Sequence, residues 1–394
     1  MTPETFQGGR RPLWGFSAAG VAGLLVTSIG FAFSPRKVLP SYLVAFVYWA
    51  GVAVAALILL SIFHASRGRW MVVLRRPLET MAESCALMVP LFLPIALGMK
   101  ELYIWVAPPP ELGEHTLRLL ELKRPWLNVP FFLVRAAVYF AVWVGVGWAL
   151  SRWSRQQDRA PGDFWLTAKQ HRLGAGALPV LAVTLTFAAF DWLMSLRPEW
   201  YSTLFGVYYF AGSVLAVFAL LALVVVLGRT APLPGAQVTS AHLHSLGKFL
   251  LAFVAFWAYV AYSQFLLMWI ANLPEEVPWY LERTTGGWQL VAVALGLGHF
   301  VLPFLALLSA KLKVRPALLG LAAGWLLWAH YLDLYWLVMP TLRGPVASPA
   351  WSDFTAFVGV GALTVAFGIW RLRGAYAVPV GDPFLEESLR YRPS

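Results

Sequence analysis

Ten apolar stretches, each of about 20 residues, occupy most of this 394-residue sequence. They lie near 14–33, 42–64, 83–104, 129–150, 176–197, 203–227, 248–272, 287–310, 317–339 and 352–373. An apolar run of this length is what an α-helix needs to cross the hydrocarbon core of a bilayer. Most runs are bounded by proline, glycine or charged residues, where helices tend to end. We therefore predict an all-α integral membrane protein with ten transmembrane helices, folded as a single polytopic membrane domain over residues 1–394.

The composition agrees with a lipid environment. Hydrophobic residues make up 59% of the chain and charged residues only 12%, whereas soluble proteins contain about 25% charged residues. The only cysteine, Cys85, excludes a disulfide framework and any cysteine-rich zinc or iron–sulfur site within this sequence. The net charge of +11 comes from short loops between apolar runs. It therefore indicates membrane topology and does not indicate nucleic-acid binding.

Lysine and arginine are concentrated on one side of the predicted membrane domain. The amino terminus, every second loop and the carboxyl-terminal tail hold most of the 30 basic residues. Positively charged loops are retained in the cytoplasm, so both termini are predicted to be cytoplasmic. The longest loop on the opposite side spans 105–128 and is expected to contain a short helix near 114–122.

Ionisable side chains inside the predicted spans are the first candidates for a functional site, because they are rare and costly in a membrane. Arg135, Asp191 and Asp333 lie at a similar depth from the outer surface. His330 shares a helix face with Asp333, three residues away. We predict that these four residues form one outer cluster and line an outer half-channel for protons.

A second group lies towards the cytoplasm. Glu83 begins the third span, and Lys248, Tyr259 and Ser263 fall on one face of the seventh. We predict that these four line an inner half-channel. Weaker candidates within or at the ends of spans are His64, His299 and Gln264. No catalytic or metal-binding residue is predicted.

Structural explanations stay open for each group. Arg135 and an aspartate can form a buried ion pair that only holds helices together. His64, Glu79 and Lys248 can extend to the membrane surface, as amphipathic side chains do. His299 and His330 could ligate a haem, although nothing in the sequence shows that they face each other. Asp191 and Asp333 are the hardest to dismiss, because a deep carboxylate needs a partner, water or a proton.

Three motifs carry a resemblance to a known family. They are "RRPLETMAESCALMVPLFLPI" near the third span, "FDWLMSLRPEWYSTLFGVYYFAG" at 190–212 and "HLHSLGKFLLAFVAFWAYVAYSQFLLMWIANLPEE" at 242–276. The sequence resembles the ActF membrane subunits of bacterial alternative complex III, which are related to the NrfD/PsrC family. The resemblance extends over most of the chain and includes the number of spans.

This resemblance implies two four-helix bundles, spans 2–5 (42–197) and 6–9 (203–339), with spans 1 and 10 at the periphery. It implies a quinol:cytochrome c or quinol:oxidase oxidoreductase of the bacterial inner membrane, with quinol as a possible substrate. Haem c and iron–sulfur clusters would reside in partner subunits, and this chain would bind no cofactor. The expected partners are an ActC-like quinone-binding homologue, an iron–sulfur subunit, c-type cytochromes, a terminal oxidase and membrane lipid, with no nucleic acid. ActF-like subunits would contribute polar half-channels for protons.

Two other functions remain possible. The chain could be a purely structural anchor for redox subunits, in which case its buried charges move nothing. It could also be a stand-alone proton-coupled transporter. Transporters often contain broken helices in both halves of an internal repeat. Pro90 and Pro94 could break the third span, but no matching break is evident in the second half.

Overall fold

The computed structural model describes residues 5–230 and 237–392, and over these residues it is α-helical with no β-strand. Ten helical segments of this described part are long and apolar enough to cross a membrane. They span Arg10–Phe33, Pro35–Ser66, Arg69–Leu97, Val129–Gln157, Phe164–Leu196, Phe205–Leu227, Ser240–Ala271, Trp288–Leu308, Pro316–Arg343 and Trp351–Leu372. Each predicted span corresponds to one of these segments. The chain therefore has the architecture of a multi-pass membrane protein.

Most spans are built on one continuous helix. The long helices are α1 (Arg10–Phe33), α2 (Pro35–Ala65), α8 (Val129–Gln157), α9 (Phe164–Trp192), α10 (Phe205–Leu227), α11 (Ser240–Ala271), α16 (Pro316–Arg343) and α17 (Trp351–Leu372). Short helices lie in the connections between spans: α6 (Met99–Leu102), α7 (Glu114–Lys123), α12 (Val277–Glu282) and α15 (Ala310–Val314). Another short helix, α18 (Leu385–Leu389), follows the last span. The short helix predicted near 114–122 is thus confirmed as α7.

The third span is divided into η1 (Arg69–Leu74), α3 (Arg75–Glu83), α4 (Cys85–Leu91) and α5 (Leu93–Leu97). Pro90 lies inside α4, and Pro94 lies in the first turn of α5. Proline lacks the amide hydrogen that a helix needs and collides with the preceding turn. The expected break at these prolines is therefore confirmed.

The eighth span is also irregular, which the sequence did not predict. It consists of α13 (Trp288–Leu295), a π-helical turn η5 (Gly296–Val301) and α14 (Leu302–Leu308). The π turn carries His299. Such turns are rare and are frequently found at functional sites, so His299 is a candidate for a functional residue.

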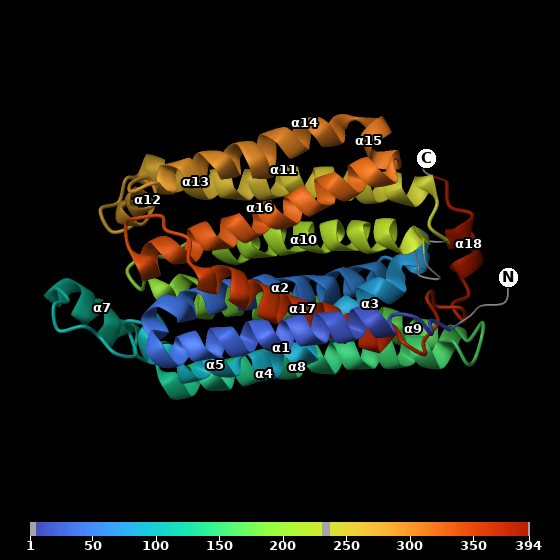
Figure 1. Cartoon of the computed structure of the whole chain (residues 1–394), viewed down its shortest axis with the longest axis horizontal. Helices are drawn as coiled ribbons and strands as arrows, with labels where there is room; N and C mark the ends of the chain where they lie inside the picture. Colours follow the sequence, from blue (N-terminus) through green and yellow to red (C-terminus); the bar gives the residue numbers. More distant parts are fainter. Residues whose placement is uncertain (1–4, 231–236, 393–394) are drawn as a thin grey trace.

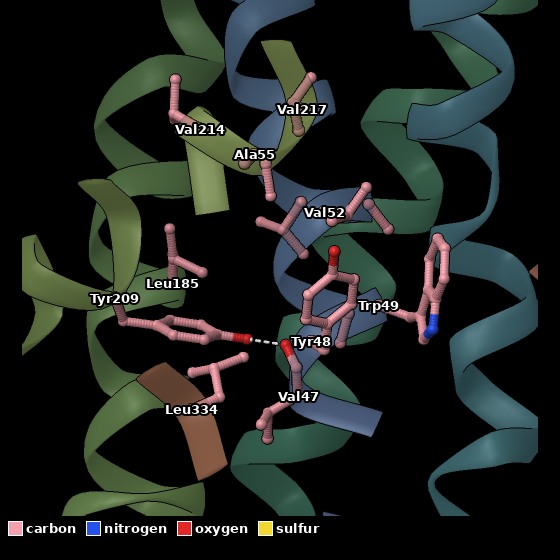
Figure 2. Close-up of a cluster of buried hydrophobic side chains, with 14 of the residues drawn as sticks. Val47, Tyr48, Trp49, Val52, Ala55, Leu185, Tyr209, Val214, Val217 and Leu334 are labelled. Atoms are coloured by element: carbon pink, nitrogen blue, oxygen red, sulfur yellow. Dashed lines mark hydrogen bonds between the residues drawn. The ribbon is translucent and has the colours of Figure 1, made fainter. Parts of the chain in front are cut away.

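Helix α2 is the centre of the structure. Its residues 38–61 are all buried, and it packs against α3, α9, α10, α16 and α17. Figure 1 shows α2 between α10 on one side and the α1–α17 pair on the other. In Figure 2, Val52 and Ala55 of α2 face apolar side chains of its neighbours, and the Tyr209 hydroxyl of α10 donates a hydrogen bond to the Val47 carbonyl. A helix that is apolar on every side is expected to be buried in this way.

The two ends of the bundle differ. The start of α1 and the whole of α18 lie at one end, and α7 projects from the other (Figure 1). Helix α18 is fixed to η1, because the Ser388 hydroxyl accepts a hydrogen bond from the Val73 amide at 3.1 Å. Phe6, just before α1, exchanges backbone hydrogen bonds with Gly374 and Ala375, just after α17, so these two segments lie at the same end of the bundle.

Helices α1 and α17 pack closely through small residues. A Cβ atom added to Gly23 would lie 2.8 Å from the Cα of Gly359. Small residues at such contacts let two membrane helices approach. We expect Gly23→Leu to lower the free energy of unfolding by about 1–3 kcal/mol, measured as thermal stability in detergent. Gly15→Leu on the same helix is the control, because a Cβ there meets no atom within 4 Å. Equal losses in both variants would contradict this account.

Candidate functional site: a buried carboxylate beside two histidines

Asp333 is held between three helices. It lies on α16 and is 1% exposed. The Tyr208 hydroxyl of α10 donates a hydrogen bond to its Oδ1, and Trp257 Nε1 of α11 donates to its Oδ2 at 3.1 Å. Among the described residues, no cation forms an ion pair with Asp333. This is therefore a buried carboxyl group whose hydrogen-bonding partners are both neutral.

Two imidazole rings belong to the same site. His330 precedes Asp333 by one helical turn, and His299 comes from the π turn; they are 1% and 0% exposed. The His299 ring centroid is 4.0 Å from that of Trp257 and 6.3 Å from that of His330. Within the described part of the chain, none of the four ring nitrogens has a hydrogen-bond partner. Buried polar atoms are nearly always paired, so these nitrogens need an explanation such as ordered water or proton exchange.

Haem ligation does not fit this geometry. The His299 ring packs against Trp257. The His330 ring is enclosed as well, since its centroid lies 5.2 Å from that of Tyr48. A Cβ added to Gly212 would come within 2.8 Å of His330 Cε1. A porphyrin needs open space between and around its two ligands, and closely packed neighbours occupy that space here.

Arg135 and Asp191 form a second, closed site between α8 and α9. Arg135 Nε and Nη2 each donate to one carboxylate oxygen of Asp191 at 2.8 Å. Tyr139 and Trp126 donate to the same carboxylate at 2.7 and 3.2 Å. The guanidinium carbon lies 4.2 Å from the Trp126 ring centroid. A paired and fully hydrogen-bonded carboxylate of this kind is suited to holding helices together.

The predicted outer cluster is therefore two sites and not one. Arg135 and Asp191 join α8 to α9, whereas His330 and Asp333 on α16 face α10 and α11. In the described structure no hydrogen bond or ion pair connects the two pairs. Equal depth in the membrane does not determine which helices are neighbours, and this is why the prediction of one cluster was wrong. Whether either site moves protons stays a prediction.

The predicted inner group is not brought together either. Glu83 is 8% exposed and accepts hydrogen bonds from Arg155 Nη2 at 2.8 Å and Arg371 Nε at 2.7 Å. Lys248 is exposed, Ser263 is half-buried, and Tyr259 is 67% exposed. The reason is helix placement, because α3 packs against α2, α8 and α17 while α11 packs against α10, α14 and α15. The face of α11 that carries Lys248, Tyr259 and Ser263 therefore does not contact Glu83.

The weaker candidates have separate surroundings. The backbone carbonyl of His64 accepts a hydrogen bond from His171 Nδ1 at 2.9 Å, and the buried His64 Nε2 has no partner in the described structure. Gln264 is buried and accepts a hydrogen bond from the Ser202 hydroxyl at 3.0 Å. Gln264 thus links the seventh span to the loop before α10.

A charge network at the start of α3 was not predicted. Arg76 pairs with Glu79 at 2.8 Å and with Asp158 at 2.5 Å, and Arg75 pairs with Asp382 at 2.5 Å. The i, i+3 spacing of Arg76 and Glu79 was visible in the sequence. The two aspartates come from distant loops, so no local pattern could identify them. Burial raises the pKa of Asp158, although Arg76 opposes this effect.

Arg283 is a second residue that sequence reasoning missed. Its side chain is 0% exposed, and its guanidinium carbon lies 3.5 Å from the Trp279 ring centroid. It donates hydrogen bonds to the Leu337 carbonyl at 2.6 Å and to the Thr341 hydroxyl at 3.1 Å. Burial lowers the pKa of Arg283 to about 9, which leaves it charged at neutral pH. It therefore joins the loop after α11 to the end of α16.

Glu83 holds α3 to α8 and α17, and we expect Glu83→Gln to destabilise the fold. The two arginines are partly exposed, at 28% and 29%, so solvent screening limits the loss to about 1 kcal/mol. Thermal unfolding of the purified chain measures this change. Glu387→Gln is the control, because Glu387 pairs with Arg69 while 56% exposed. If Glu83→Gln unfolds at the wild-type temperature, Glu83 does not act as a structural clamp.

Comparison of the sequence with protein-family models and with curated proteins found no match. No group of three or more His, Cys, Asp and Glu side chains within residues 5–230 and 237–392 is arranged to hold a metal ion. We therefore infer a function from the geometry above and from the three sequence motifs.

Proposed function

We propose that this chain is a membrane subunit of a quinol-linked respiratory oxidoreductase and that protons move through the site around Asp333. The observation that carries the proposal is a buried carboxyl group without a cation, next to two buried imidazoles that lack hydrogen-bond partners. An isolated charge is costly in a membrane. A charge that forms on one of these groups is therefore favourably removed by taking up a proton or by passing one on. The site is therefore suited to exchanging protons.

Quinol oxidation releases protons, and the site around Asp333 is suited to moving them. Oxidation of a quinol releases two electrons and two protons, and each needs its own route. Electrons would pass to the haem c and iron–sulfur clusters of partner subunits. In this chain, Asp333 would exchange a proton with the neighbouring imidazoles, while Tyr208 and Trp257 hold its two oxygens in place. The Tyr208 hydroxyl can rotate and so accept as well as donate.

The same proposal includes two four-helix bundles, spans 2–5 and 6–9. Contacts of α2 with α3 and α9, and of α10 with α11 and α16, support this grouping. The pairing of α1 with α17 supports their place at the periphery. Both termini would be cytoplasmic in a bacterial inner membrane, with an ActC-like subunit, an iron–sulfur subunit, c-type cytochromes and a terminal oxidase as partners.

Purification of the tagged chain in mild detergent tests the proposal. We expect several subunits to co-purify and a reduced-minus-oxidised spectrum with c-type haem absorbance. A colourless chain that emerges alone, stable and monodisperse, would overturn the assignment to a respiratory complex. A tagged, unrelated multi-span protein from the same membranes is the control for non-specific capture.

A purely structural anchor is the second candidate. The closed Arg135–Asp191 pair favours it, because a carboxylate with every partner satisfied has no reason to change its protonation. The two candidates differ at Asp333. An anchor would assemble the complex and tolerate neutralisation of that residue without loss of proton coupling.

A further inference from the structure

A pocket of about 440 Å³ lies at the end of the bundle where α2 finishes and α9 begins. Residues of η1 and of the carboxyl-terminal tail complete its walls. Much of the lining is apolar and includes Leu60, Phe63, Val72, Phe164 and Phe384. Phe164 is 65% exposed. One wall of the pocket is therefore apolar and reaches the exposed surface of the bundle.

Four arginines line this pocket: Arg67, Arg69, Arg75 and Arg172. Two of them are neutralised, since Arg69 pairs with Glu387 and Arg75 pairs with Asp382. Arg67 and Arg172 are exposed and form no ion pair with any described residue. Asp382 is the only carboxylate of the lining, and it already binds Arg75. The pocket therefore presents two guanidinium groups without counter-charges.

One further observation points to a ligand. His64 lines the pocket, and its buried Nε2 has no partner in the described part of the chain. Buried polar atoms are nearly always paired, so a group bound at this corner of the pocket accounts for the unpaired nitrogen. Arg67 follows the end of α2 with a φ of 54°, the left-handed conformation that commonly closes a helix. Its amide donates to the His64 carbonyl, and the Gly68 amide donates to the Phe63 carbonyl.

We propose that this pocket binds the phosphate of an anionic lipid, with its acyl chains against the apolar wall. Guanidinium groups bind phosphate oxygens through paired hydrogen bonds. Basic pockets between membrane helices on the cytoplasmic side are suited to phosphate-bearing headgroups. The apolar lining at Phe63 and Phe164 gives an amphiphile more contact than a free phosphate ion could use. This site is separate from the one around Asp333 and does not depend on the function proposed above.

The test measures binding of fluorescent phosphatidylglycerol to the delipidated full-length chain in detergent. The double variant Arg67→Gln/Arg172→Gln is expected to weaken binding on the order of 30-fold, because each surface arginine contributes about five-fold and the two factors multiply. Arg118→Gln/Arg124→Gln removes the same charge from exposed positions in the loop at 105–128 and should leave the affinity unchanged. Equal affinities for wild type and the Arg67/Arg172 variant would overturn the proposal, as would equally tight binding of phosphatidylcholine.

Inorganic phosphate separates the two sources of the same chemistry. We expect millimolar phosphate to compete poorly with the lipid, and we expect Phe164→Ser to weaken lipid binding. If phosphate alone displaces the lipid fully and Phe164→Ser has no effect, the ligand is a soluble phosphate and the lipid assignment is wrong. Circular dichroism of each variant checks folding, which exposed side chains such as Arg67 and Phe164 should not disturb.

Discussion

Under the function proposed above, replacement of Asp333 by asparagine is expected to slow proton-coupled quinol oxidation by the assembled complex about 100-fold, in the range expected for loss of a proton-transferring group. The variant removes the carboxyl group that accepts hydrogen bonds from both Tyr208 and Trp257. Asparagine has almost the same shape, so the packing of α10, α11 and α16 should remain. The measurements are the rate of quinol oxidation and the rate of the accompanying proton release, in vesicles that contain the complex.

Asparagine at position 333 can keep the hydrogen bonds to Trp257 and Tyr208. An asparagine oxygen can accept from Trp257 Nε1, and its amide group can donate to the Tyr208 hydroxyl, which also accepts. Both positions of the carboxylate thus keep a partner, and we expect the free energy of unfolding to change by about 1 kcal/mol or less. A loss of activity without a loss of assembly would therefore report on the proton and not on the fold.

Two variants control this experiment. Asp333→Glu keeps a titratable group and should retain part of the coupling. Glu275→Gln neutralises a carboxylate that is 59% exposed and should leave coupling unchanged. A complex with Asp333→Asn that assembles normally and releases protons as the wild type does would exclude the proposed role and favour the structural anchor.

Separation of Arg135 from Asp191 is expected to have the largest effect on stability. Arg135→Met leaves the Asp191 carboxylate buried without its cation, at 1% exposure. Breaking a buried ion pair from one side costs about 3–5 kcal/mol. We expect the variant to unfold at a markedly lower temperature or to fail to accumulate in the membrane. Arg118→Met removes an exposed arginine and should have almost no effect.

The double variant Arg135→Met/Asp191→Leu distinguishes a structural pair from a proton relay. Replacing both members with apolar residues removes the unpaired charge, so most of the lost stability should return. If the pair is structural, proton coupling also returns. A stable double variant without proton coupling would instead place Arg135 or Asp191 on the proton route.

The contrast between the two aspartates explains why they receive different roles. Both lie within spans and both are 1% exposed. Asp191 has a cation and two neutral donors, so its charge is fully compensated. Asp333 has only the two neutral donors and stands beside two unpaired imidazoles. A neighbouring cation makes Asp191 a structural carboxylate, and the lack of one among the described residues leaves Asp333 suited to exchanging a proton.

The number, order and approximate bounds of the spans could be predicted from the sequence alone. Each span is a local property, since its length and hydrophobicity are read from consecutive residues. The break at Pro90 and Pro94 was predictable for the same reason, because proline acts on its own turn. The sequence also identified Asp191, Asp333, His330 and Arg135 as unusual, because ionisable residues stand out in apolar surroundings.

Which of these residues meet depends on how the helices pack, and this could not be predicted from the sequence. Asp333 finds Tyr208 and Trp257, which are 125 and 76 residues away along the chain. Arg75 finds Asp382 across 307 residues. Helices in a membrane are apolar on most faces, so hydrophobic periodicity does not fix their rotation or their neighbours. Packing of small residues and pairing of buried polar groups supply that information, and both depend on contacts between segments that are distant in the sequence.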